Sequence, residues 1–321
     1  MRNLLFLKIF LILFIAAGFF VYSRAQQIVD TPHKVTEDTF VQITTGMPLQ
    51  NIAEMLRRNK LIEHNYEFIL YVKLNKLYPK FKAGEYLINN DISVAGLADL
   101  FSGGKTHLRK LTIPEGLTAR EAMDIILNNE YLENDFTPFK EGEILPETYT
   151  FSRHEERQKL VNQAKQALDK VLSQAWENRD ADLPLKNKDE MLILASIVEK
   201  ETGVADERPQ VASVFINRLK KDMLLQTDPT VIYALTEGKS DLKRSLTRKD
   251  LEIDSPYNTY KYAGLPPTPI CNPGKAAIEA VAHPDKTPYL YFVASGNGGH
   301  NFARTLEEHN NNVRKWKAVS K

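Results

Sequence analysis

An apolar run close to the N-terminus limits where the rest of this chain can fold. Leu4 to Tyr22 reads LLFLKIFLILFIAAGFFVY and carries one charge, Lys8. About 20 apolar residues span the hydrocarbon core of a bilayer as a helix, and a lysine near one end can reach the headgroups. The alternative is a cleaved signal peptide, because SRA at 23–25 resembles a cleavage site. We favour an uncleaved anchor because the run is long, and the flanking charges favour a body outside the cytoplasm.

The composition excludes several classes of protein. With 321 residues and a formal net charge of +1, the chain is long enough for about two domains and offers no electrostatic argument for nucleic acid binding. Cys271 is the single cysteine, so the sequence contains no disulfide framework. Neither a phosphate-binding P-loop motif nor an HExxH motif occurs. We therefore expect neither a cofactor nor a metal site.

The pattern of apolar residues and breakers predicts an α+β fold with several parts. ITTGMPLQNIAEML from Ile43 and IPEGLTAREAMDII from Ile113 both read as strand, glycine and amphipathic helix, which indicates a recurring unit or a duplication. Tyr66 to Leu77 predicts a second amphipathic helix, Ser93 a helix N-cap, and YLYFVA at 289–294 a buried strand. The expected divisions are an anchor at 1–24, a linker at 25–38, a strand-helix unit at 39–105, a second such unit with a connecting helix at 106–184, and a last domain at 185–321.

Two glutamates stand two residues apart in SIVEKETG, residues 196–203, inside an apolar segment that predicts a helix. On a helical wheel Glu201 falls in the aliphatic sector, between Ile197 and Leu194, whereas Glu199 falls in the polar sector and is expected at the surface. A carboxyl among aliphatic side chains has a raised pKa and can act as a general acid near neutral pH. The alternative is that Glu201 lies at a fraying helix end and reaches water.

The segments that follow are rich in aromatic, amide and proline residues. YNTYKY lies among prolines, and such a rigid aromatic loop suits a sugar or peptide groove. Asp228 precedes Pro229, so it can also be a helix N-cap. We expect Gln226, Asp228, Tyr257 and Asn258 to lie with Glu201 in one cleft. The other candidates for substrate binding are Tyr260, Asn217, His300 and Glu147.

Four stretches of the chain resemble the endolytic murein transglycosylases. They are EGEILPETYTF at 141–151, the segment from LASIVEKETGV to TDPTVIYAL at 194–235, SPYNTYKYAGLPPTPICNPG at 255–274 and AHPDKTPYLYFVASGNGGHNF at 282–302. The resemblance implies an inner-membrane anchor, a lysin-motif-like subdomain at 39–105 and an extracytoplasmic catalytic domain at 185–321. It also implies that Glu201 is the catalytic glutamate.

The implied reaction is non-hydrolytic cleavage of peptidoglycan glycan strands between N-acetylmuramic acid and N-acetylglucosamine, which leaves 1,6-anhydro ends. One glutamate can serve as acid and then as base, whereas a typical glycoside hydrolase needs two carboxyls. Asp228 or Glu147 could supply the second, so a hydrolase stays open, as does a non-catalytic peptidoglycan-binding scaffold. The implied partners are glycan strands, the inner membrane and peptidoglycan synthases, without nucleic acid.

Overall fold

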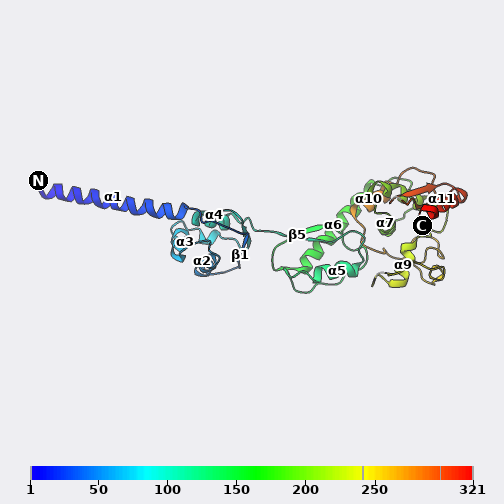
Figure 1. The fold of residues 1–321 in the computed structure, drawn as a ribbon, viewed down its shortest axis with the longest axis horizontal. Helices are drawn as coiled ribbons and strands as arrows, with labels where there is room; N and C mark the ends of the chain where they lie inside the picture. The colour runs from blue at the N-terminus through cyan, green and yellow to red at the C-terminus, as the bar shows by residue number, and fades with distance from the viewer. Residues whose placement is uncertain (1, 241, 297, 320–321) are drawn as a thin grey trace. The chain divides into compact units, whose positions relative to one another are not determined.

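The computed structural model describes residues 2–240, 242–296 and 298–319, which form a mixed α+β fold (Figure 1). The chain divides into two compact units, Met1–Arg109 and Lys110–Lys321, and each is described here by itself. The expected finer divisions of the chain remain predictions.

The first unit pairs two strands and covers them with helices. Its elements in chain order are α1 (Arg2–Asp30), β1 (Thr39–Ile43), α2 (Leu49–Arg58), α3 (Asn65–Leu74), the short 3-10 helix η1 (Tyr78–Lys80), β2 (Gly84–Ile88) and α4 (Val94–Gly103). β1 and β2 are antiparallel. The predicted N-cap at Ser93 is confirmed, because its hydroxyl accepts a hydrogen bond of 3.1 Å from the Gly96 amide. The likeness of this unit to a lysin motif stays a prediction.

The N-terminal helix α1 contains a stretch, Lys8–Asp30, that is long and apolar enough to cross a membrane, and the side chains of its apolar window are exposed. This is compatible with the expected anchor. The helix continues past the SRA site without a break, and Val29 near its end packs against the core of the first unit.

The second unit contains the remaining elements, arranged as short strand pairs and packed helices. They are β3 (Arg109–Thr112), α5 (Ala119–Leu127), β4 (Leu132–Glu133), β5 (Thr148–Phe151), β6 (Glu155–Glu156), α6 (Arg157–Asn178), α7 (Lys188–Glu201), η2 (Ala205–Glu207), α8 (Arg208–Leu219), α9 (Asp228–Thr236), η3 (Asp250–Glu252), α10 (Lys275–Ala282), β7 (Tyr291–Ala294), β8 (His300–Ala303) and α11 (Leu306–Val319). The strand pairs are β3 with β5, β4 with β6, and β7 with β8.

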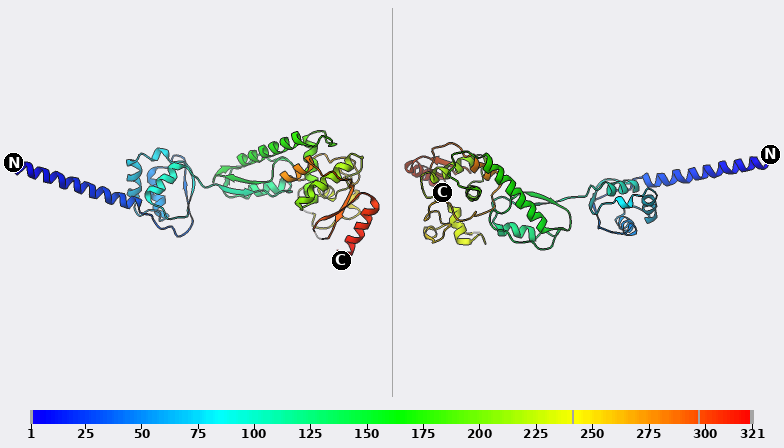
Figure 2. Two further views of the ribbon diagram at one scale, coloured as in Figure 1. Left: turned by 90° about the horizontal axis from the view of Figure 1, so that it is seen from above. Right: turned by 180° about the vertical axis from the view of Figure 1, so that it is seen from behind.

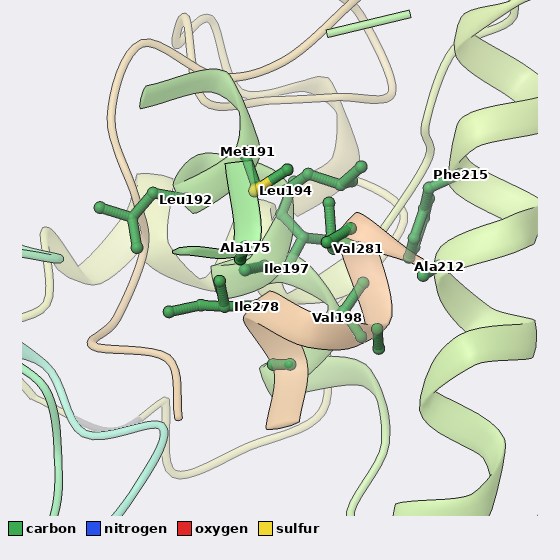
Figure 3. Close-up of a cluster of buried hydrophobic side chains, with 14 of the residues drawn as sticks. Ala175, Met191, Leu192, Leu194, Ile197, Val198, Ala212, Phe215, Ile278 and Val281 are labelled. Atoms are coloured by element: carbon green, nitrogen blue, oxygen red, sulfur yellow. The ribbon is translucent and has the colours of Figure 1, made fainter. Parts of the chain in front are cut away.

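Two apolar clusters fill this unit, and α6 takes part in both. Leu160 and Val161 in its first half pack with the side chains of β5 and α5, while Leu168 and Leu172 further along pack with α7, α8 and α10. Figure 2 shows α6, in green, as one long helix of this unit. The second cluster surrounds α7, and Figure 3 shows its side chains.

Some predictions about these elements hold and others fail. Each echoed segment begins where a strand, β1 or β3, ends and then forms a turn and a helix, and the glycines in the turns, Gly46 and Gly116, have the same φ of 75°. The predicted buried strand is only half-buried, because β7 pairs with β8 alone in this sheet and Tyr291, Phe292 and Val293 line a cavity. α3 is not amphipathic either, since apolar side chains lie on its exposed side as well.

Candidate active site

The site is built on α7, a helix whose central part is buried on every side. Asn187 caps its N-terminus by accepting a hydrogen bond of 2.9 Å from the Glu190 amide, and all residues from Met191 to Val198 are buried. In Figure 3 the aliphatic side chains of α7 meet those of α8 and α10. The last residue of this rigid helix is Glu201, so its carboxyl is held in a fixed place.

The Glu201 carboxyl is partly buried and accepts a hydrogen bond from the Thr227 hydroxyl. Burial raises its pKa to about 7, and the negative charge of Asp228 acts in the same direction. The hydrogen bond from Thr227 is the largest opposing effect, followed by the nearby His300 and Arg218. A carboxyl with this pKa is close to half protonated at neutral pH, so it can both donate and accept a proton.

Glu201 opens onto a cavity of about 420 Å³ that also contains Gln226, Asp228 and Tyr260. The structure therefore brings these three predicted residues together with Glu201. The Tyr260 hydroxyl donates a hydrogen bond of 2.6 Å to Asp228. Asp228 is the first residue of α9, where Thr227 occupies the N-cap position, so the predicted capping role of Asp228 is wrong and its side chain lines the cavity instead.

Arg218 lines the same cavity and was missed by the sequence analysis. Its guanidinium donates to the carbonyl oxygens of Leu290 at 2.7 Å and Leu225 at 2.8 Å, and it lies 5.2 Å from the ring centre of Tyr291. Burial lowers its pKa from the ordinary arginine value. The sequence does contain a feature that indicates a buried Arg218, because this residue follows the inward-facing Val211 by seven positions on α8.

Tyr257 and Asn258 lie outside the set of residues that line this cavity. Asn258 is fully buried, and its amide donates to the carbonyls of Leu251 at 2.9 Å and Ile253 at 2.8 Å. The Tyr257 hydroxyl is 2.6 Å from that of Thr268. Both side chains thus hold the loop in shape, because their polar groups are engaged within the protein.

The other three candidates for substrate binding also lie outside the residues that line the cavity. Asn217 donates to the carbonyls of Thr287 at 2.8 Å and of Tyr289 at 3.0 Å, which ties α8 to the segment before β7. His300 pairs with Glu207, with 2.8 Å between Nδ1 and Oε2, and acts on Glu201 only through its charge. Glu147 is exposed in the turn before β5.

The expectation that Glu199 is a surface residue is wrong. Its side chain is only 6% exposed, accepts a hydrogen bond of 2.9 Å from the Gly274 amide and lies 3.5 Å from the Arg208 guanidinium. The wheel failed because the turn at Gly116 packs over this side of α7, where the Lys200 ammonium donates to the Gly116 carbonyl at 3.2 Å.

A second buried carboxyl, Glu141, has a structural task. Burial raises its pKa to about 7, and it accepts a hydrogen bond of 2.7 Å from the Ala119 amide. Ala119 is the first residue of α5, so Glu141 binds the positive end of that helix. Glu141 is not among the residues that line the Glu201 cavity.

A larger cavity, of about 650 Å³, lies elsewhere in this unit. It lies among residues of α6, α8 and α10 and does not include Glu201. Its acidic residue, Glu279, is 3.5 Å from the Lys275 ammonium. Among the described residues, no group of three or more His, Cys, Asp or Glu side chains is arranged to hold a metal ion. The chemistry that this unit can perform is therefore best placed at Glu201.

The chain is similar to several known proteins. A profile of the YceG-like family matches residues 41–315. An endolytic murein transglycosylase of Bacillus subtilis (strain 168) is 34% identical over 339 residues, which cover 94% of this chain and 91% of that protein. An endolytic murein transglycosylase of Streptococcus pneumoniae (serotype 2, strain D39) is 31% identical over 360 residues, which cover 95% of this chain but 63% of the longer relative.

A solved structure is similar as well. The 2.6 Å crystal structure of a YceG-like protein from Listeria monocytogenes superposes with a TM-score of 0.54 at 33% sequence identity. The match covers 86% of this chain and 99% of that one.

Proposed function

The chain belongs to the YceG-like family, and from that premise we propose that it is a lyase, an endolytic murein transglycosylase that cleaves the glycan strands of peptidoglycan. The names of its relatives support this activity. The observation that carries the proposal is Glu201, a carboxyl with a pKa raised to about 7 that faces a cavity on a rigid helix. A single carboxyl of this kind can supply the proton that a glycosidic leaving group needs.

In the proposed reaction, Glu201 donates its proton to the oxygen that links C1 of N-acetylmuramic acid to N-acetylglucosamine. The bond between that oxygen and C1 breaks, and the 6-hydroxyl oxygen of the muramic sugar forms a new bond to the same C1. The 6-hydroxyl proton passes to the Glu201 carboxylate, which restores the acid. No water is consumed, so the product has a 1,6-anhydro end.

The surroundings of Glu201 suit this double role. The Thr227 hydroxyl orients the carboxyl and keeps its pKa from rising further. The buried Arg218 places positive charge close to it and favours the carboxylate after proton donation. Because the two effects oppose burial, the carboxyl can change its protonation state within one turnover without a large energetic cost.

Asp228 supports one alternative, a two-carboxylate hydrolase. It lies in the same cavity as Glu201, which is the arrangement that a hydrolase uses to activate water. Its carboxylate is already engaged by the Tyr260 hydroxyl at 2.6 Å, which suits a binding role for this pair better. The products separate the two activities, because a hydrolase leaves reducing ends and a transglycosylase leaves anhydro ends.

The decisive experiment is mass spectrometry of the products that the protein forms from purified glycan strands. We expect anhydro ends with the wild-type chain and nearly none with Glu201→Gln, which keeps the size of the side chain and can accept the Thr227 hydrogen bond. General acid catalysis is typically worth about 10²–10⁴-fold. Loss of cleavage in Glu201→Gln would exclude a non-catalytic scaffold.

Glu199→Gln is the matched control, because it changes the same residue type on the same helix. We expect it to retain cleavage of the strands. It should lower the free energy of unfolding by about 1–3 kcal/mol, since it removes the negative charge that lies beside the Arg208 guanidinium. An inactive but folded Glu199→Gln variant, together with an active Glu201→Gln variant, would overturn the assignment of the acid.

A further inference from the structure

Helix α3 exposes apolar side chains in a row. Phe68 and Val72 are fully buried in the core of the first unit, as expected for an inward face. On the other side Tyr66, Leu70 and Leu74 are 64%, 55% and 73% exposed. Their spacing of four residues places them on one face of the helix. A surface helix of a soluble protein carries polar residues there, so this face requires an explanation.

This exposed row adjoins the end of the N-terminal helix. A cavity of about 340 Å³ is lined by both helices, and its apolar and amide side chains include Tyr22, Gln26, Val29, Tyr66, Leu70 and Leu74. α1 and α3 belong to the same compact unit, and α1 runs into that unit in Figure 1. The apolar face of α3 is thus continuous with the surface of the proposed anchor.

The cavity lies beside the part of α1 where the surface of a bilayer is expected. The apolar run of α1 ends at Tyr22 and is followed by the polar residues Arg24 and Gln26. A helix of about 20 residues crosses about 30 Å of hydrocarbon, so the boundary of the hydrocarbon core falls close to Tyr22. Tyrosines prefer this interfacial layer, and both Tyr22 and Tyr66 line the cavity.

We propose that the face of α3 formed by Tyr66, Leu70 and Leu74 rests in the interfacial layer of the membrane that α1 crosses. The exposed Lys73 and Lys76 at the C-terminal end of α3 are placed to contact anionic headgroups. Glu67 is the acidic residue that lines the cavity, and it lies at the N-terminal end of the helix. The contact would prevent the first unit from swinging freely about its anchor. This proposal rests on α1 as the anchor and is independent of the catalytic activity.

The test places a fluorophore on this face and measures its contact with lipid. Leu70→Cys and Leu74→Cys are prepared in the full-length chain, with Leu108→Cys as the control, because Leu108 is a leucine of the same unit that is 50% exposed and does not line the cavity. The native Cys271 is fully buried and is not expected to react, which labelling of the wild-type chain verifies. Each labelled protein is reconstituted into vesicles of phosphatidylethanolamine and phosphatidylglycerol that contain a headgroup-nitroxide lipid.

We expect the nitroxide lipid to quench the fluorophore several-fold more strongly at positions 70 and 74 than at 108. Equal quenching at the three positions, or none at 70 and 74, would overturn the proposal. A fluorophore at position 70 could instead be shielded from water without being quenched, to a degree that depends on the ratio of protein to lipid. That result would show that a second copy of the chain covers the face. Resistance to carbonate extraction, measured on the same vesicles, shows separately whether α1 is inserted.

A second variant tests the face itself. Leu70→Gln with Leu74→Gln keeps two exposed positions on the helix and removes their apolar surface. A fluorophore at Tyr66→Cys should then lose its quenching, while carbonate resistance and cleavage of purified strands stay unchanged. Unchanged quenching in this variant would mean that the apolar face does not hold α3 against the membrane.

Discussion

At the scale of single residues, the behaviour of Glu201 follows from two opposing effects. Burial disfavours the carboxylate, whereas the Thr227 hydroxyl donates a hydrogen bond that favours it. Sequence reasoning reached the first effect, because the helical spacing of Ile197 and Leu194 around Glu201 can be seen in the sequence. It missed the second, because Thr227 reaches Glu201 from the N-cap position of another helix, α9.

The hydrogen bond from Thr227 leads to a prediction about the pH profile. The acid must be protonated before cleavage, so kcat/KM should fall as the pH rises above about 7. Thr227→Val removes a bond that lowers the pKa of Glu201, so it should move this falling limb to higher pH. Thr227→Ser keeps the hydroxyl, so kcat/KM should fall at the same pH as in the wild type. Profiles of strand cleavage for the three proteins provide the measurement, and a limb that is identical in all of them would contradict the assignment.

The raised pKa of Glu201 also predicts how stability depends on pH. Between about pH 4.5 and about pH 7 the folded protein binds more protons at this site than the unfolded chain, so the contribution of Glu201 to stability decreases as the pH rises. Glu201→Gln has no carboxyl at this position, so the variant does not lose stability through ionisation of this side chain. Its stability relative to the wild type should increase by up to about 3 kcal/mol from about pH 5 to about pH 8.

Urea unfolding of both proteins at the two pH values measures this difference. A difference in the free energy of unfolding that stays constant with pH would show that the carboxyl is ionised in the folded state throughout the range. The expected sign is opposite to that of a surface carboxyl in an ion pair, whose loss would destabilise the protein most at high pH.

At the scale of elements, regular apolar spacing predicted the helices well and the loops poorly. The connecting helix expected within 106–184 is α6, and its apolar side chains repeat with helical periodicity over many turns. The wheel for α7 correctly assigned the aliphatic side but put Glu199 in water. A wheel describes one helix alone, and the turn at Gly116 that covers Glu199 comes from a segment distant in sequence.

The candidate site was likewise predicted only in part from the sequence. Gln226, Asp228 and Tyr260 were found because their local sequences contain polar and aromatic residues beside breakers. Asn258 was assigned to the cleft on the same grounds, yet its amide is consumed by two backbone carbonyls. Composition shows that a loop is special, but it does not separate a side chain that binds a ligand from one that supports the loop.

The loop at 141–147 leads to a prediction at this scale. Gly142 has a φ of 71°, and a Cβ placed there would lie 2.6 Å from Cγ of Pro269. Its amide donates to Asn272 at 3.1 Å, which joins this loop to the segment before α10. Gly142→Ala should therefore lower the free energy of unfolding by about 2 kcal/mol or more, because the left-handed backbone and the clash both disfavour alanine.

Gly203→Ala is the control, since a Cβ at Gly203 meets no atom within 4 Å and its backbone is not left-handed. Thermal unfolding compares the two variants. Similar melting temperatures for both would show that the loop can move away from Pro269 without cost.

At the scale of the whole molecule, each unit has a core of its own. The first unit encloses its cluster between the β1–β2 pair and three helices, and the second encloses Glu201 and all the residues that line its cavity. The catalytic chemistry proposed for the chain thus needs no side chain from the first unit. The first unit and its helix α1 are free to determine where the enzyme acts.

This separation leads to the last prediction, that removing residues 1–24 changes location but not chemistry. The full-length protein should stay in the membrane pellet through washing with alkaline carbonate, because the apolar run of α1 is long enough to span the bilayer. The shortened protein should be soluble and should cleave purified strands at the wild-type rate. Mature protein that begins at Gln26 and is found free of the membrane would contradict the anchor, whereas loss of cleavage by the shortened protein would show that the first unit takes part in the reaction.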